Sequence, residues 1–148
     1  MKIIKASKRD LNEVARLFDL YRQFYQCSPD FPLAKEFIGE RLLHNDSAIF
    51  IAVEDDVVKG FVQLYPSFCS VEAIKIMILY DLYIDEPYRS EGIGELLMLK
   101  AKSFALEQGT QRIDLMTAFS NKAGQHLYEK LGYEITSQDF HHYSLSLP

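Results

Sequence analysis

The chain has 148 residues and a mass of 17.1 kDa, a length that suits a single domain, residues 1–148. Hydrophobic residues make up 48% and charged residues 25%, as in soluble globular domains, which argues against a disordered or fibrous chain. A net charge of −5 argues against general nucleic-acid binding, which needs a basic surface. Cys27 and Cys69 are far apart and form no C-x-x-C pair, so neither a disulfide framework nor a cysteine zinc site is expected.

The predicted elements alternate between strands and helices. Apolar side chains recur at helical spacing in some segments and at the spacing of strands in others, and Gly, Pro or Asp residues separate the segments. In chain order, we predict a strand over residues 2–6, helices over 11–25 and 30–42, a hairpin of strands over 47–53 and 57–65, a long strand over 75–84, a helix over 92–108, a strand over 111–116, a helix over 122–131, and strands over 133–136 and 140–147.

This order predicts an α/β fold with a mixed sheet and helices on both faces. The hairpin over residues 47–65 implies antiparallel pairing. The strand–helix–strand passage over residues 75–116 implies some parallel pairing, because parallel neighbours need a crossover.

The segment with the clearest chemistry is residues 81–94, where a strand runs into a turn and Arg89-x-x-Gly92-x-Gly94 opens a helix. The two glycines let a ligand approach the main chain, and the first N–H groups of a helix have no partners inside it. Such a helix start suits a phosphate or diphosphate. No G-x-x-x-x-G-K-[ST] loop is present, and Leu97 stands where a dinucleotide fold has its third glycine, so both of those nucleotide folds are disfavoured.

Two motifs resemble those of the GNAT superfamily of N-acetyltransferases. Residues 88–94, Tyr-Arg-Ser-Glu-Gly-Ile-Gly, are similar to motif A of that family, and residues 121–133, from Asn121 to the Leu-Tyr-x-x-x-Gly-Tyr end, are similar to its second signature. Residues 21–25 and 141–145 resemble the branch that includes yeast histone/polyamine acetyltransferases. The resemblance implies a central, mostly antiparallel mixed sheet flanked by about four helices.

The resemblance also implies roles for particular residues. The main chain of Leu82, Tyr83 and Ile84 would pair with the pantetheine arm of acetyl-CoA, Asn121 would hydrogen-bond that arm, and Tyr128 would protonate the departing thiolate. The amides that would hold the diphosphate belong to Arg89, Ser90, Glu91, Gly92, Ile93, Gly94 and Glu95.

Three assignments have a structural alternative. Some polyamine acetylators place a glutamate base where Tyr80 stands here, so we take the next residue, Asp81, as the catalytic carboxylate. The alternative is a structural role, in which the Asp81 carboxylate forms an ion pair or a cap at the edge of the sheet. Tyr21 and Tyr25 lie one helical turn apart and belong either to the core or to the acceptor site. Tyr128 is alternatively a core aromatic residue.

The sequence favours an enzyme that transfers acetyl from acetyl-CoA directly to a primary amine: a polyamine, a small amino compound or a lysine side chain. The alternatives are a non-catalytic acyl-CoA sensor or regulatory module and an interaction domain that shares the fold. His126, His141 and His142 have no metal-ligand spacing, so no metal is expected.

The expected partners are the amine substrate and a second copy of the chain. The strand expected over residues 140–147 is an edge strand that could pair two copies into a homodimer. Nucleic-acid and membrane partners are not expected. Residues 1–5 turn charged too soon for a signal peptide, and the apolar run over 76–80 is too short to span a bilayer, so we expect a cytoplasmic protein.

Overall fold

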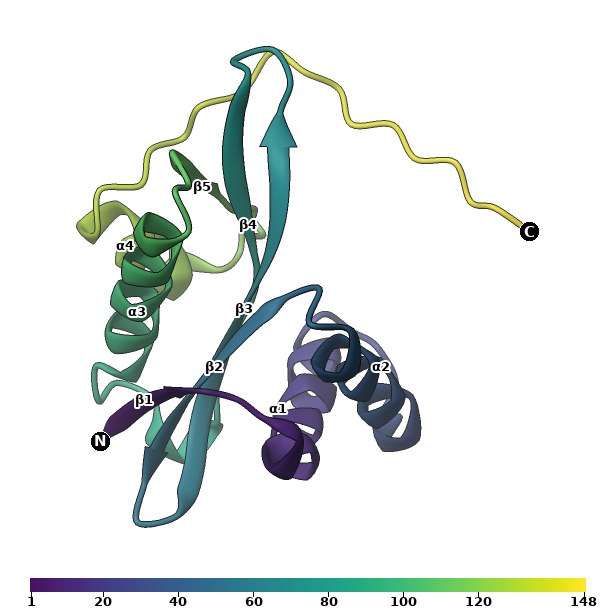
Figure 1. Cartoon of the computed structure of the whole chain (residues 1–148), viewed down its shortest axis with the longest axis vertical. Coiled ribbons are helices and arrows are strands. Elements are labelled where there is room, and N and C mark those ends of the chain that lie inside the picture. Colours follow the sequence, from purple (N-terminus) through teal and green to yellow (C-terminus); the bar gives the residue numbers. More distant parts are fainter. The chain divides into compact units, whose positions relative to one another are not determined.

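The computed structural model describes residues 1–148 and contains two compact units, Met1–Met116 and Thr117–Pro148. The first unit holds a five-stranded sheet in the order β1-β2-β3-β4-β5 (Figure 1). β1 to β4 pair antiparallel and β5 pairs parallel to β4, which confirms the predicted mixed sheet. The strands are β1 (Lys2–Lys5), β2 (Ala48–Glu54), β3 (Val57–Cys69), β4 (Ile74–Ile84) and β5 (Arg112–Asp114).

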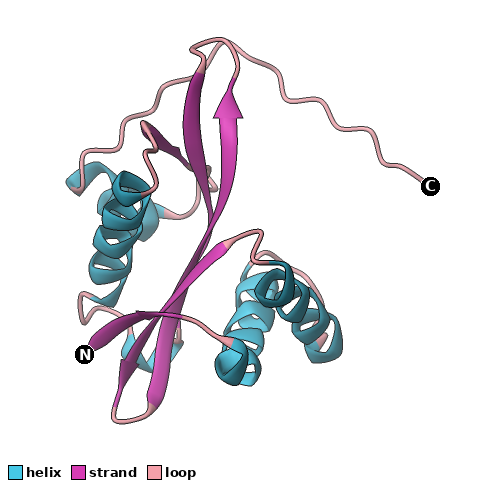
Figure 2. Ribbon diagram, viewed as in Figure 1, coloured by secondary structure: helices cyan, strands magenta, loops and turns pink.

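Helices cover both faces of the sheet in the first unit. α1 (Leu11–Phe24) and α2 (Phe31–His44) lie on one face, and α3 (Ile93–Glu107) lies on the other (Figures 1 and 2). Short 3-10 helices, η1 (Lys8–Asp10) and η2 (Glu86–Tyr88), precede α1 and α3. The second unit contains α4 (Lys122–Lys130).

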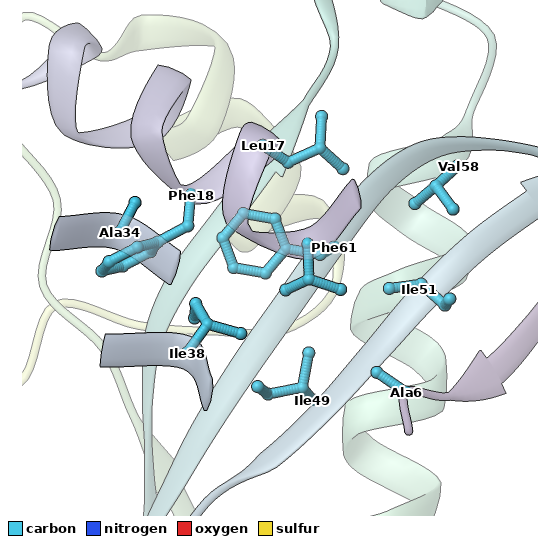
Figure 3. Close-up of a cluster of buried hydrophobic side chains, with 10 residues drawn as sticks. Ala6, Leu17, Phe18, Ala34, Ile38, Ile49, Ile51, Val58 and Phe61 are labelled. Atoms are coloured by element: carbon cyan, nitrogen blue, oxygen red, sulfur yellow. The ribbon is translucent and has the colours of Figure 1, made fainter. Parts of the chain in front are cut away.

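The core on the α1 and α2 face is aromatic and aliphatic. Phe61 of β3 is fully buried, and its ring lies 6.4 Å from that of Phe18 of α1. Figure 3 shows these rings together with Leu17, Ile38 and Ile49, which come from α1, α2 and β2. This packing fixes α1 against β3, so the face of α1 that carries Tyr21 is turned toward the sheet.

A β-bulge in β4 decides which side chains reach this face. Gln63 of β3 pairs with Asp81, but the next residue, Leu64, pairs with Leu79, so Tyr80 is an extra residue without a partner. Directly opposed residues on antiparallel strands share a face, and neighbouring residues alternate. Asp81 therefore lies on the α1 and α2 face with Gln63, although Leu79, two residues earlier, lies on the α3 face with Leu64.

The end of the chain differs from the sequence prediction. The strands predicted over residues 133–136 and 140–147 are absent, and the chain after Gly132 contains no helix or strand (Figure 2). Alternation of apolar residues indicates a strand only where a neighbouring strand supplies hydrogen bonds, and this segment has no such pairing. β5 is also shorter than predicted and spans Arg112–Asp114.

Candidate active site

The turn between β4 and α3 presents a row of unused main-chain donors. The N–H groups of residues 90–94 donate no hydrogen bond within the protein, and the first helical bond runs from Leu96 N to the carbonyl of Gly92 at 3.2 Å. Ser90 and Gly92 have φ angles of 66° and 80°, which turn the successive N–H groups into a concave nest. A nest at a helix N-terminus is an anion site, because the helix dipole adds partial positive charge there.

Arg89 differs from residues 90–94 because its main-chain N–H group is already hydrogen-bonded. Its N–H already donates to the carbonyl of Glu86 at 3.3 Å, so this amide does not belong to the free row. Its guanidinium group donates from Nε to the carbonyl of Ile84 at 3.0 Å and lies 5.3 Å from the ring of Tyr83. The side chain therefore ties the turn to the end of β4.

The C-terminal half of β4 has a neighbouring strand on one side only. β3 pairs with every residue of β4 except Tyr80, whereas β5 pairs only with Ile76, Met77 and Ile78. The main chain of Leu82, Tyr83 and Ile84 thus lies beyond the end of β5. An extended ligand can bind such an edge as an added strand would.

Asp81 is a buried carboxyl group on the α1 and α2 face. Asp81 is 2% exposed, and its Oδ2 accepts a hydrogen bond from Nε2 of Gln63 at 2.5 Å. The hydroxyl of Tyr21 donates to the carbonyl of Tyr80 at 3.0 Å and lies close to Asp81. Burial raises the pKa of Asp81 from 3.8 to about 6, although the hydrogen bond from Gln63 and the nearby hydroxyl of Tyr21 act in the opposite direction. A carboxyl group with such a pKa accepts and releases protons near neutral pH.

Tyrosines surround this carboxyl group. The rings of Tyr21 and Tyr25 on α1 are 5.1 Å apart, and those of Tyr65 on β3 and Tyr80 on β4 are 5.9 Å apart. Burial and the charge of Asp81 raise the pKa of Tyr21, Tyr25 and Tyr65, so these phenols stay neutral at physiological pH. Because the phenols are neutral, Asp81 is the one member of this group that carries a negative charge. Aromatic faces beside a carboxylate suit an organic cation.

Sequence reasoning found three members of this cluster, Tyr21, Tyr25 and Asp81, and missed Gln63 and Tyr65. The structure brings Tyr21, Tyr25 and Asp81 together. Gln63 is an amide between the apolar residues Val62 and Leu64 of a strand, which was the available signal for a buried polar contact.

Asn121 and Tyr128 belong to the second unit. Asn121 caps α4, since its Oδ1 accepts from the N–H of Gly124 at 3.1 Å and its Nδ2 donates to Oγ1 of Thr117 at 3.0 Å. The ring of Tyr128 lies 6.1 Å from the ring of Tyr133. The roles of Asn121 and Tyr128 toward acetyl-CoA stay predictions.

Neither a cluster of metal-binding side chains nor a helix able to span a bilayer is found in the structure. No three side chains of His, Cys, Asp or Glu gather in a way that could hold a metal ion. None of the helices has both the length and the apolar character needed to span a bilayer.

Comparison with known proteins agrees with this geometry. The model of the acetyltransferase (GNAT) family matches residues 14–133. An uncharacterized N-acetyltransferase of Bacillus subtilis (strain 168), YhfO, is 38% identical over 148 residues, which are 100% of this chain and 99% of the relative. A probable acetyltransferase of Haemophilus influenzae is 32% identical over 70% of this chain and 72% of its own.

A solved structure leads to the same assignment. The crystal structure of a probable acetyltransferase superposes with a TM-score of 0.89 at 33% identity and covers 100% of this chain and 99% of its own. Members of this family use acetyl-CoA as co-substrate. The chain belongs to the GNAT family and is an acetyl-CoA-dependent N-acetyltransferase.

Proposed function

We propose that this enzyme transfers the acetyl group directly to a primary amine that binds as a cation beside Asp81. The amine is a polyamine, a small amino compound or a lysine side chain. The observation that carries the proposal is the buried carboxyl group of Asp81, with a pKa of about 6, among neutral tyrosines. The similarity of residues 21–25 and 141–145 to the yeast histone/polyamine branch favours the same substrates.

Asp81 supplies the proton acceptor that this reaction needs. An amine with a pKa of about 10.4 is neutral in only about one molecule in 2,500 at pH 7, and only the neutral form attacks a thioester. At that pH about nine-tenths of a carboxyl group with a pKa of about 6 is ionised. Asp81 takes one proton from the ammonium group, directly or through water, and the freed nitrogen lone pair forms the C–N bond.

The departing thiolate of CoA must also be protonated. As the C–S bond breaks, the thiolate receives the hydroxyl proton of Tyr128, and the second proton that the nitrogen loses restores the phenol. No covalent enzyme intermediate forms, because no activated nucleophile is present. This assignment of Tyr128 rests on the family resemblance of residues 121–133.

The first unit fits the CoA moiety in two places. The free N–H groups of residues 90–94 suit a diphosphate, and the main chain of Leu82, Tyr83 and Ile84 suits the amides of a pantetheine arm. Glu91 and Glu95 add negative charge to this turn, so we assign the diphosphate to the N–H groups of the main chain. In the second unit, Asn121 would bind the pantetheine arm.

The two units are proposed to act as one catalytic domain. The family model spans residues 14–133 and therefore includes most of the first unit and more than half of the second. Cys27 and Cys69 are free thiols, which supports a reducing compartment such as the cytoplasm.

We also propose that the protein is a homodimer paired through its C-terminal segment. Residues 140–147 alternate apolar and polar side chains and form no strand within the chain. Large apolar side chains there are solvent-exposed, which is unfavourable unless another surface covers them. These are Phe140, Tyr143, Leu145 and Leu147, which are 82–88% exposed.

An acetylation screen tests the main proposal. Release of free CoA thiol from acetyl-CoA is measured with polyamines, amino acids, aminoglycosides and lysine-containing peptides, and mass spectrometry identifies the product. We expect turnover with a cationic primary amine and an N-acetylated product. Binding of acetyl-CoA without turnover on any amine would instead favour an acyl-CoA sensor.

Replacement of Asp81 by Asn should lower activity and raise stability. The folded chain binds the Asp81 proton more tightly than the unfolded chain does, so the free energy of unfolding falls as pH rises from about 4 to about 6. Above that range ionised Asp81 costs about 3 kcal/mol, and Asp81→Asn removes this cost. Urea unfolding at about pH 4 and pH 8 measures it. An equal stability difference between variant and wild type at both pH values would contradict the buried carboxylate.

Replacement of Tyr128 by Phe tests the proposed acid. Phe keeps the ring and removes the proton donor, so kcat should fall about 10²–10⁴-fold while the affinity for acetyl-CoA stays nearly intact. Tyr133→Phe is the matched control, because Tyr133 is its ring neighbour and has no proposed part in catalysis. A variant Tyr128→Phe with unchanged kcat across the pH range would exclude this role.

Sedimentation velocity tests the proposed homodimer. The full chain should sediment as a dimer at micromolar concentration, and the double variant Tyr143→Asp, Leu145→Asp should sediment as a monomer, because charges oppose burial of the segment. A wild-type chain that is monomeric under these conditions would refute the homodimer.

A further inference from the structure

A chain of hydrogen bonds crosses the sheet from the partly buried Ser47 to the buried Asp81. The hydroxyl of Ser47, the residue before β2, donates to Oε1 of Gln63 at 2.7 Å. On β3, Gln63 is 0% exposed and donates from Nε2 to Oδ2 of Asp81 on β4. Burial of an amide in an apolar sheet is costly unless both its donor and its acceptor are bonded, and here both are.

The two partners fix the orientation of the amide. An ionised carboxylate only accepts hydrogen bonds, so the NH₂ group of Gln63 must face Asp81 and its oxygen must face away from it. Ser47 supplies a hydroxyl proton to that oxygen. The bulge at Tyr80 and the pairing of Gln63 with Asp81 then hold the amide and the carboxyl group directly opposite each other.

We infer that Gln63, itself oriented by Ser47, is a positioning residue that holds the Asp81 carboxyl group ionised and fixed in direction for proton transfer from the amine. The inference rests on the proposed function only in its last part, the transfer of a proton to Asp81. The positioning of Asp81 by Gln63 is inferred from the hydrogen bonds alone.

Burial, the hydrogen bond from Gln63 and the nearby hydroxyl of Tyr21 together set the pKa of Asp81. Tyr21 and Tyr25 face it from α1 and Tyr65 from β3, and all three have raised pKa values, so they do not titrate between about pH 5 and pH 9. Toward α2, Arg41 pairs with Asp46 beside Tyr65, with 2.8 Å between Nε and Oδ1. Tyr80 is the adjacent residue on β4 itself.

The variant Gln63→Met removes the amide at similar volume. A hydrogen bond from an amide N–H favours the ionised carboxyl group, so its loss should raise the pKa of Asp81 above about 6. Ser47→Ala should act in the same direction but more weakly, because it frees the amide without removing it. Gln23→Met is the matched control: Gln23 also donates to an aspartate, Oδ2 of Asp19 at 3.2 Å, within α1.

Two readouts separate the inference from the proposed function. Carbon-13 NMR titration of the Asp81 carboxyl group, without substrate, should show an upward shift of about one pH unit in Gln63→Met, a smaller one in Ser47→Ala and none in Gln23→Met. In parallel, kcat/KM of Gln63→Met near pH 5 should fall about tenfold, with little loss near pH 9.

Each result has a defined meaning. An Asp81 titration unchanged in both Gln63→Met and Ser47→Ala would overturn the inference, and Ser47→Ala provides this test even if Gln63→Met does not fold. If the Asp81 titration moves but the pH dependence of kcat/KM does not, then Gln63 holds Asp81 as inferred and the proposed role of Asp81 as proton acceptor is wrong.

Discussion

The hydrogen bond between Gln63 and Asp81 is the interaction on which the proposed amine site depends. It links two buried polar side chains across β3 and β4, at the point where the extra residue Tyr80 turns Asp81 toward α1. Without the bulge, Asp81 would share a face with Leu79 and lie under α3. The hydrogen bond from the Tyr21 hydroxyl to the Tyr80 carbonyl connects α1 to the same bulge. The packing of α1 and the direction of the Asp81 carboxyl group therefore depend on the same residues.

The same strand also borders the proposed acetyl-CoA site. β4 is paired along its length with β3, but β5 accompanies it only over Ile76–Ile78, so its C-terminal half has a free edge that leads into the nest at residues 90–94. The carboxyl group and the anion site are thus set by one strand and the turn that follows it. Because the raised pKa of Asp81 comes mainly from burial, its ionised form, which is the proposed proton acceptor, lowers the stability of the folded chain.

Much of the fold follows from the sequence, because its signals are local. Helical spacing, the Asp30 cap and the hairpin turn predict α1, α2 and β2 closely, and the glycines of residues 92–94 predict the turn before α3. The start of β3 is also predicted, but the strand continues to Cys69, beyond the predicted end at residue 65. The strands expected at the C-terminal end are absent because a strand depends on a partner, which alternation alone does not supply. The cluster around Asp81 could be predicted only in part. Its completion by Gln63 and Tyr65 depends on the register of β3 against β4 and on the bulge, which no spacing within one strand reveals.

The most direct test of the account is a crystal structure with a bisubstrate analogue in which the sulfur of CoA is linked to an aliphatic primary amine. We predict that the diphosphate accepts hydrogen bonds from the N–H groups of residues 90–94, and that the amine nitrogen lies within about 2.6–3.2 Å of the Asp81 carboxyl group or reaches it through one water. An amine on the α3 face of the sheet, or a diphosphate bound away from that turn, would contradict the account.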